Sequence, residues 1–157
     1  MKVLVRRLKP VDWQEFYPLF KLVLEEDFPD YPQEARELFM NETRLKRAFE
    51  RKKREFWVAE GDGKIVGFLT AMGSPGGVTF INWLGVKKEF RGQEIGKSLV
   101  KTWEDWAKTK GYHKLRAQTT QVGNKSFYKK LGFRLEGIKK NDLYHLDHLI
   151  FGKTIST

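Results

Sequence analysis

The chain has 157 residues, of which 40% are apolar and none is cysteine, and its formal net charge is +10. This length suits one domain with its own apolar core, and without cysteine no disulfide or thiolate chemistry is available, which fits a reducing cytoplasm. The positive charge favours anionic partners: nucleic acid, an acidic membrane surface or a polyphosphate cofactor. The opening MKVLVRRLKP is too poor in apolar residues for a signal peptide, and no other run is long enough to cross a bilayer. We therefore expect a cytoplasmic protein that does not span a membrane.

The first half of the chain alternates between strand and helix patterns. Residues 2–8 predict a strand, apolar residues at helical spacing from Leu19 to Leu24 predict a helix, and Pro32 opens a second helical stretch. Two apolar runs within residues 55–73 flank Gly61-Asp62-Gly63 and predict a β-hairpin. The segment VTFINWLGV, rich in β-branched and aromatic residues, predicts the next strand.

The densest positive charge lies in RLKRAFERKKRE, residues 44–55. Leu45, Ala48 and Phe49 recur there at helical spacing, which favours a solvated helix face with one apolar stripe. An RNA-binding patch is the alternative, and it is disfavoured because no stacking aromatic residues are interleaved with the charges.

The second half continues the alternation of strands and helices. Residues from Ile95 onward predict a helix that ends at Gly111, followed by a strand over 113–120. A short helix over 124–133 has Asn124 as its expected N-cap, and two more strands are expected over 133–138 and 143–152. No repeat or linker divides the chain, so residues 1–157 are expected to form a single domain.

The stretch EFRGQEIGKSLV, residues 89–100, has the composition of a phosphate-binding loop that runs into a helix. A nucleoside-triphosphate loop of the Walker type needs four residues between its first glycine and its Gly-Lys-Ser/Thr. Here only three residues separate Gly92 from Gly96, and Arg91 stands where that first glycine would be required. The remaining interpretation is a loop whose amides bind a pyrophosphate at the N-terminus of the helix.

Two motifs in order resemble the GCN5-related N-acetyltransferase (GNAT) family. Residues 91–96, RGQEIG, are similar to the family's arginine-or-glutamine, x, x, glycine, x, glycine-or-alanine signature. Residues 128–133, YKKLGF, are similar to its tyrosine, x, x, leucine-glycine-phenylalanine segment, and Leu84-Gly85-Val86 is similar to its strand end. The order of expected elements resembles its α/β (α+β) fold over nearly the whole chain. The resemblance implies a mixed, mostly antiparallel sheet flanked by about four helices, with its fourth and fifth strands splayed around the pantetheine arm of acetyl-CoA.

The resemblance also implies an acetyl-CoA-dependent N-acetyltransferase in which a neutral amine attacks the thioester directly. Tyr128 would then be the catalytic acid that protonates the departing sulfur, because burial raises the proton affinity of the thiolate. Backbone groups of two residues before the loop would pair with the pantetheine amides, and the loop amides and cations would bind the pyrophosphate. The expected cofactor-binding residues are Leu84, Val86, Arg91, Gly92, Gln93, Glu94, Ile95, Gly96, Lys97 and Asn124.

Three departures from the family pattern stand out. Glu94 occupies the usual position of the middle glycine, and its carboxylate either faces the pyrophosphate or turns to solvent. The family's asparagine often lies seven residues before the tyrosine, where this chain has Gln121, whereas Asn124 lies four before. The strand VTFINWLGV lacks the glutamate that often removes the amine proton. The acids between the first two helices, Glu25, Glu26, Asp27 and Asp30, are the candidate bases, with a water chain as the alternative.

The acceptor is less defined than the donor. The acidic segment LEEDFPDYP favours a cationic small molecule or a protein amine, and nucleic acid is not the expected partner. No metal is expected, because His145 and His148 on one strand would face opposite sides. Two other functions remain open: a non-catalytic acyl-CoA-binding module, in which Tyr128 is a core residue, and a basic RNA-binding protein that uses residues 44–54.

Overall fold

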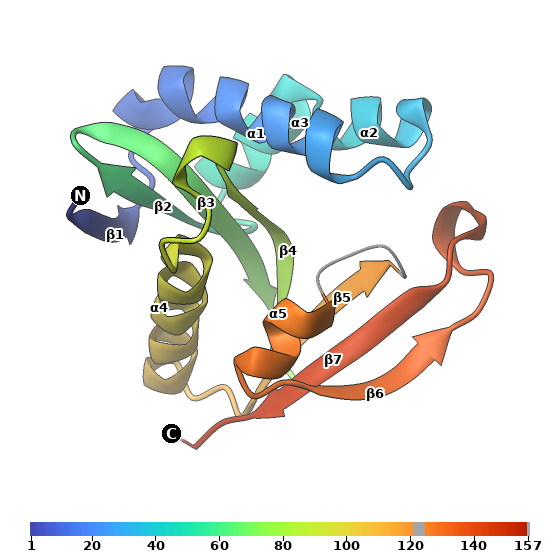
Figure 1. The fold of residues 1–157 in the computed structure, drawn as a ribbon. Coiled ribbons are helices and arrows are strands. Elements are labelled where there is room, and N and C mark those ends of the chain that lie inside the picture. Colours follow the sequence, from blue (N-terminus) through green and yellow to red (C-terminus); the bar gives the residue numbers. More distant parts are fainter. Residues whose placement is uncertain (121–124, 157) are drawn as a thin grey trace.

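The computed structural model describes residues 1–120 and 125–156. Its strands and helices follow the expected order (Figure 1). They are β1 (Val3–Arg7), α1 (Trp13–Asp27), α2 (Gln33–Phe39), α3 (Glu42–Glu50), β2 (Glu55–Gly61), β3 (Lys64–Gly73), β4 (Val78–Val86), α4 (Ile95–Thr109), β5 (Lys114–Thr120), α5 (Lys125–Lys130), β6 (Arg134–Lys139) and β7 (His148–Thr154). Short 3₁₀ turns lie at Pro10–Asp12, Lys88–Phe90 and Leu143–His145.

The strands form one mixed sheet in the order β1-β2-β3-β4-β5-β7-β6, in which only β4 and β5 are parallel. That parallel pairing covers three residue pairs, from Val78 opposite Lys114 to Phe80 opposite Arg116. Beyond these pairs the two strands separate, as Figure 1 shows, so the middle of the sheet opens into a V. The splayed strands that the resemblance implied are therefore present.

Alternation along the strands builds a core on each face of the sheet. In β2, Phe56 and Val58 join a cluster under α1 and α3, whereas Trp57 and Ala59 join a second cluster under α4 and α5. Figure 1 accordingly shows α1–α3 along one side of the sheet and α4 on the other. None of the helices in the described ranges is long and apolar enough to cross a membrane.

Two boundaries differ from the sequence expectation. The last strand starts at His148 rather than at residue 143, because Tyr144 and His145 adopt positive φ angles of 56° and 62° in a 3₁₀ turn. The helix favoured for residues 44–55 is present as α3, but it begins earlier, after Asn41, whose side-chain oxygen accepts a hydrogen bond of 2.9 Å from the amide of Arg44. Leu45 is buried on its apolar face, as the spacing in residues 44–55 predicted.

Candidate active site

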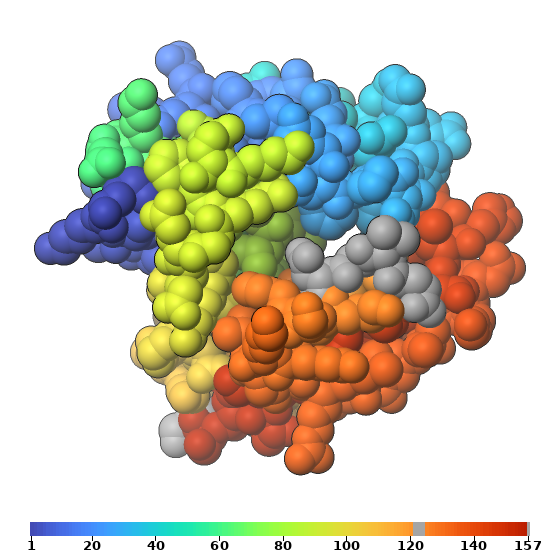
Figure 2. Space-filling view, in the orientation of Figure 1, coloured from blue at the N-terminus to red at the C-terminus, as the bar shows by residue number. Residues whose placement is uncertain are grey.

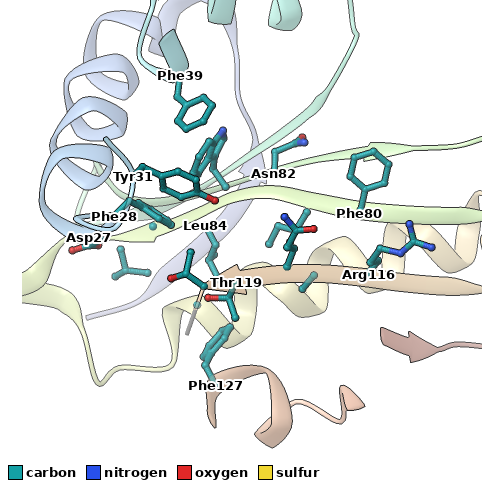
Figure 3. A pocket seen from close by; sticks show the side chains of 18 of the residues that line it. Asp27, Phe28, Tyr31, Phe39, Phe80, Asn82, Leu84, Arg116, Thr119 and Phe127 are labelled. Atoms are coloured by element: carbon teal, nitrogen blue, oxygen red, sulfur yellow. The ribbon is translucent and has the colours of Figure 1, made fainter. Parts of the chain in front are cut away.

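A cleft of about 1640 Å³ occupies the V between β4 and β5. It is lined by both strands, the α1–α2 connection, the beginnings of α3 and α4, and residues of α5. Figure 2 shows the surface hollowed between the segment that follows β4 and α5, and Figure 3 shows side chains from both strands directed into this space. A cleft of this size is large enough for two ligands side by side.

The edge of β4 that faces the cleft carries backbone groups, near its C-terminal end, that pair with no strand in the described part of the chain. The amide of Lys87 donates to the carbonyl of Val66 in β3, at 2.9 Å, so the backbone groups of Val86 and Leu84 turn to the opposite edge by alternation. Consistent with this, the Val86 carbonyl accepts a hydrogen bond of 3.2 Å from Nε of Arg91 rather than from a strand. The open edge therefore lies at the two residues expected to face the pantetheine arm.

The loop after β4 presents free amides at the start of α4. The first intrahelical hydrogen bond of α4 runs from Ser98 to the Glu94 carbonyl, at 3.0 Å, so the amides of Ile95, Gly96 and Lys97 have no acceptor within the helix. Gly92 has φ = 80°, and a Cβ atom there would meet nothing within 4 Å. These amides and the adjacent open space suit an anion at the positive end of the helix. Gln93 lies exposed in the same turn.

Glu94 adopts a left-handed backbone conformation that favours glycine. Its φ and ψ of 61° and 22° lie in the left-handed region, which costs a residue with a side chain about 1–2 kcal/mol. The side chain is 76% exposed, and its Oε1 lies 3.9 Å from Nζ of Lys97, within the same turn. The carboxylate thus faces solvent.

Arg91 connects the loop to α1. Its Nη2 lies 2.6 Å from Oδ2 of Asp27, the last residue of α1, and its Nε contacts the Val86 carbonyl. The guanidinium is therefore engaged in holding the loop, and Lys97, whose side chain is 60% exposed and whose Nζ lies 3.9 Å from Glu94, places a second cation beside the amides. Sequence reasoning assigned charge to Arg91 without its partner, because Asp27 lies 64 residues away in the chain.

Tyr128 lies on α5 and belongs to the core cluster on the α4 side of the sheet. It is 6% exposed, it stacks on Phe151 with 5.9 Å between ring centroids, and it meets Phe127 and Phe133 edge-on. Burial raises the pKa of the Tyr128 hydroxyl well above its usual value. Among the described residues that line the cleft, Phe127 is present and Tyr128 is not. Asn124 lies outside the described residues.

Three of the four acids proposed as bases contact neighbouring polar groups. Oε2 of Glu26 lies 3.4 Å from Nζ of Lys88, Asp27 pairs with Arg91, and Asp30 accepts a hydrogen bond from the Thr120 hydroxyl. Two of these carboxylates, at the end of α1, are therefore paired with cations.

A second titratable group, which sequence reasoning missed, borders the cleft. The Tyr31 hydroxyl, which lines the cleft, lies 3.2 Å from Nε2 of His148, and Oδ2 of Asp142 lies 3.4 Å from Nδ1 of the same imidazole. His148 is fully buried. Burial, and then the charge of Asp30, raises the pKa of Tyr31. No local pattern could reveal this arrangement, because 117 residues separate Tyr31 from His148.

Comparisons with known proteins agree with this geometry. The model of the acetyltransferase (GNAT) family matches residues 13–133. A probable N-acetyltransferase 14 from Danio rerio is 37% identical over 53% of this chain and 31% of its own length. An uncharacterized N-acetyltransferase from Methanocaldococcus jannaschii is 37% identical over 50% of this chain and 52% of its own. The chain thus matches about half or less of these curated relatives.

Among solved structures, the PaiA N-acetyltransferase from Thermoplasma acidophilum, in complex with coenzyme A, superposes with a TM-score of 0.78. The superposition covers 99% of this chain and 100% of that one at 21% identity. The family match over most of the chain and this likeness of fold lead to one conclusion. The chain belongs to the GNAT family of acetyltransferases.

Proposed function

We propose that the protein transfers the acetyl group of acetyl-CoA to the amine of an acceptor. The observation that supports this proposal is the combination, in one cleft, of free amides at the start of α4 with an open backbone edge on β4. A pyrophosphate joined to a chain with amide groups is complementary to both features, and acetyl-CoA has that composition.

The residues present fit this donor. The amides of Ile95, Gly96 and Lys97 would bind the pyrophosphate, with the ammonium of Lys97 beside them. Gly92 and Gln93 would give the loop its open turn, and Arg91 would hold it against α1. The backbone groups of Leu84 and Val86 would hydrogen-bond the pantetheine amides, which requires Arg91 Nε to share or release the Val86 carbonyl.

Two protons must move for each acetyl transfer to a protonated amine. The first leaves the ammonium for the Tyr31 oxygen while the Tyr31 proton passes to Nε2 of His148, and Asp142 stabilises the resulting imidazolium. The amine nitrogen then bonds to the thioester carbonyl carbon and the carbon–sulfur bond breaks. The Tyr128 hydroxyl would give its proton to the sulfur and regain one from the nitrogen, which requires α5 to shift when the donor binds, because Tyr128 does not line the cleft.

Thermal unfolding with and without ligands tests the donor site. Acetyl-CoA is expected to raise the melting temperature, whereas ATP and oxidised nicotinamide dinucleotide are not, because they lack the amide arm. An equal shift with ATP would contradict the proposal. Coenzyme A release with a panel of amines then tests turnover. Binding without turnover would indicate a non-catalytic acyl-CoA module, and salt-dependent RNA affinity without acetyl-CoA binding would indicate an RNA-binding protein.

A further inference from the structure

One part of the cleft holds cations that form no ion pair with any carboxylate among residues 1–120 and 125–156. Arg44 on α3, Lys53 and Arg54 before β2, and Arg116 on β5 all line it. We call Arg44, Lys53, Arg54 and Arg116 the basic end. Figure 3 shows Arg116 on β5 beside Phe80 of β4, where the two strands converge. The loop amides expected to bind the donor lie at the other end of β4, after Val86.

Arg54 is the central residue of the basic end. It is partly buried, and the pKa of its guanidinium is lowered first by burial and then by the like charge of Arg44. The groups that perturb this pKa include no carboxylate. A guanidinium removed from water beside a second cation, without a counter-charge, is unfavourable by itself and is relieved when an anion binds.

The neighbouring acids are turned elsewhere. Glu55, next in sequence to Arg54, pairs with Arg7 of β1 at 2.7 Å, because successive strand residues face opposite sides. Glu136 lines the cleft but pairs with Lys114 at 2.8 Å. Glu26 and Asp27, at the end of α1, pair with Lys88 and Arg91, and Asp30 accepts a hydrogen bond from Thr120. The described part of the cleft therefore leaves its cations unneutralised at the basic end, which argues against a cationic acceptor.

Aromatic rings enclose the cleft on the side of the helices. Their centroids lie 5.1–6.0 Å apart across contacts that join the α1–α2 segment, α2, β4 and the connection before β7. These rings are Phe28, Tyr31, Phe39, Trp83 and Tyr144. A walled site that contains a partly buried arginine suits one compact anionic group better than a nucleic-acid backbone, which follows exposed charge.

We propose that the acceptor amine carries a carboxylate or phosphate group, which Arg54 and Arg44 bind. This inference rests on the proposed acetyl transfer. A planar guanidinium forms paired hydrogen bonds with carboxylate and phosphate oxygens, so the anion orients the acceptor as well as attracting it. The negative group at the basic end leaves the amine of the same molecule free to point toward the middle of the cleft.

Matched acceptor pairs test the inference with the full chain. Phosphoethanolamine is compared with ethanolamine, and the dipeptide Ala-Glu with Ala-Gln, both amidated at the C-terminus so that Ala-Gln carries no carboxylate, by the rate of coenzyme A release. The anionic member of at least one pair is expected to have a kcat/KM about tenfold higher or more, which corresponds to one good charged contact. The pair whose two members differ in kcat/KM shows whether the anionic group of the acceptor is a phosphate or a carboxylate. Equal values within both pairs would overturn the inference.

Variants then assign the preference to the basic end. Arg54→Gln is expected to raise KM for the anionic acceptor about tenfold and to leave the neutral acceptor unchanged, whereas Arg54→Lys keeps part of the preference because it keeps the charge. Arg44→Gln, at an exposed position, is the second variant should Arg54→Gln fold poorly. Arg51→Gln is the control, because it removes the same charge from an exposed residue outside the cleft and should keep the preference. If Arg54→Gln and Arg51→Gln changed the preference for the anionic acceptor equally, the assignment to Arg54 would be contradicted.

Calorimetry separates this inference from the proposed function. Binding of phosphoethanolamine and Ala-Glu to the protein loaded with coenzyme A is measured for wild type and Arg54→Gln. Binding that depends on Arg54, without turnover of any amine, would support the anion site and contradict acetyl transfer. Turnover with equal kcat/KM for the anionic and neutral amines would support acetyl transfer and contradict the anion site. A short RNA that displaces Ala-Glu and needs Arg54, with no preference among the amines, would also overturn the inference.

Discussion

The ring of Tyr128 packs against three phenylalanine rings, and burial raises the pKa of its hydroxyl. A phenol in this state stays protonated across the pH range of an ordinary assay, so it is always able to donate. It is also a weaker acid than in water, so proton transfer to sulfur requires a thiolate that is equally buried.

Tyr128→Phe removes this proton while it preserves the stack on Phe151. We expect kcat to fall roughly ten- to a thousandfold and the Kd for acetyl-CoA to change only a few-fold. The wild-type rate should not fall at high pH through ionisation of Tyr128. Tyr17→Phe is the control, because its hydroxyl donates to the Met40 carbonyl at 2.6 Å and lies outside the cleft. Unchanged turnover in Tyr128→Phe would show that Tyr128 is a residue of the core and not the catalytic acid.

Tyr31 is expected to matter only for acceptors that must lose a proton. In Tyr31→Phe, kcat/KM should fall by about tenfold or more for amines whose pKa lies above the assay pH, because the route to His148 is broken. Amines that are already neutral should react almost normally. The measurement is kcat/KM against acceptor pKa at fixed pH, with Tyr112→Phe, outside the cleft, as the control. A uniform loss across all amines would assign Tyr31 to packing.

Two substitutions of Glu94 separate the effect of its backbone strain from the effect of its carboxylate charge. Glu94→Gly should raise the free energy of unfolding by about 1 kcal/mol, because glycine adopts a φ of 61° without strain. Glu94→Gln keeps the strain and should leave the affinity for acetyl-CoA unchanged, since the carboxylate faces solvent. Glu89→Gly, at a position without positive φ, should instead lower stability. Urea unfolding and a donor titration check these results. A salt-sensitive gain of affinity in Glu94→Gln would show that the carboxylate faces the phosphates.

At the scale of elements, α1 packs closely against β4 because Gly85 has no side chain. A Cβ atom there would lie 2.6 Å from Val23 of α1 and 2.8 Å from the ring of Phe68. This contact fixes the height of α1 above the strand edge that faces the cleft.

Gly85→Ala should therefore lower the free energy of unfolding by about 1–3 kcal/mol, as expected for overpacking. It should also weaken acetyl-CoA binding, because Leu84 and Val86 flank the residue. Gly137→Ala in β6 is the matched control, since its Cβ meets nothing within 4 Å, and it should not destabilise the protein. Equal urea midpoints for the two variants would show that α1 adjusts without cost.

The sequence alone predicted those elements that depend on residues close together in the chain. Apolar spacing predicted α1, α4 and the hairpin, and the two glycine-containing motifs predicted the loop before α4 and the end of α5. The start of β7 was missed because the positive φ of Tyr144 and His145 depends on their tertiary setting and not on glycine. The ion pair of Arg91 and the contact of Tyr31 with His148 were missed because each joins residues far apart in the chain.

At the scale of the molecule, β4 and β5 are hydrogen-bonded only near the narrow end of the V. A donor that fills the V would add hydrogen bonds where the sheet has none. Acetyl-CoA is expected to slow amide hydrogen exchange in residues 84–86 and 95–97, and to leave β1 unaffected. Protection spread evenly over all seven strands would indicate general stabilisation instead of binding in the V.

The ion pair between Arg91 and Asp27 has a consequence for the order of events in catalysis. It joins the loop of the donor site to the last residue of α1, and Tyr31 follows four residues later in the segment that borders the acceptor. A ligand that fixes the loop therefore also restrains that segment before a second ligand arrives. Because such an effect is reciprocal, each substrate should bind more tightly in the presence of the other. The two binding events would then be thermodynamically linked through one guanidinium.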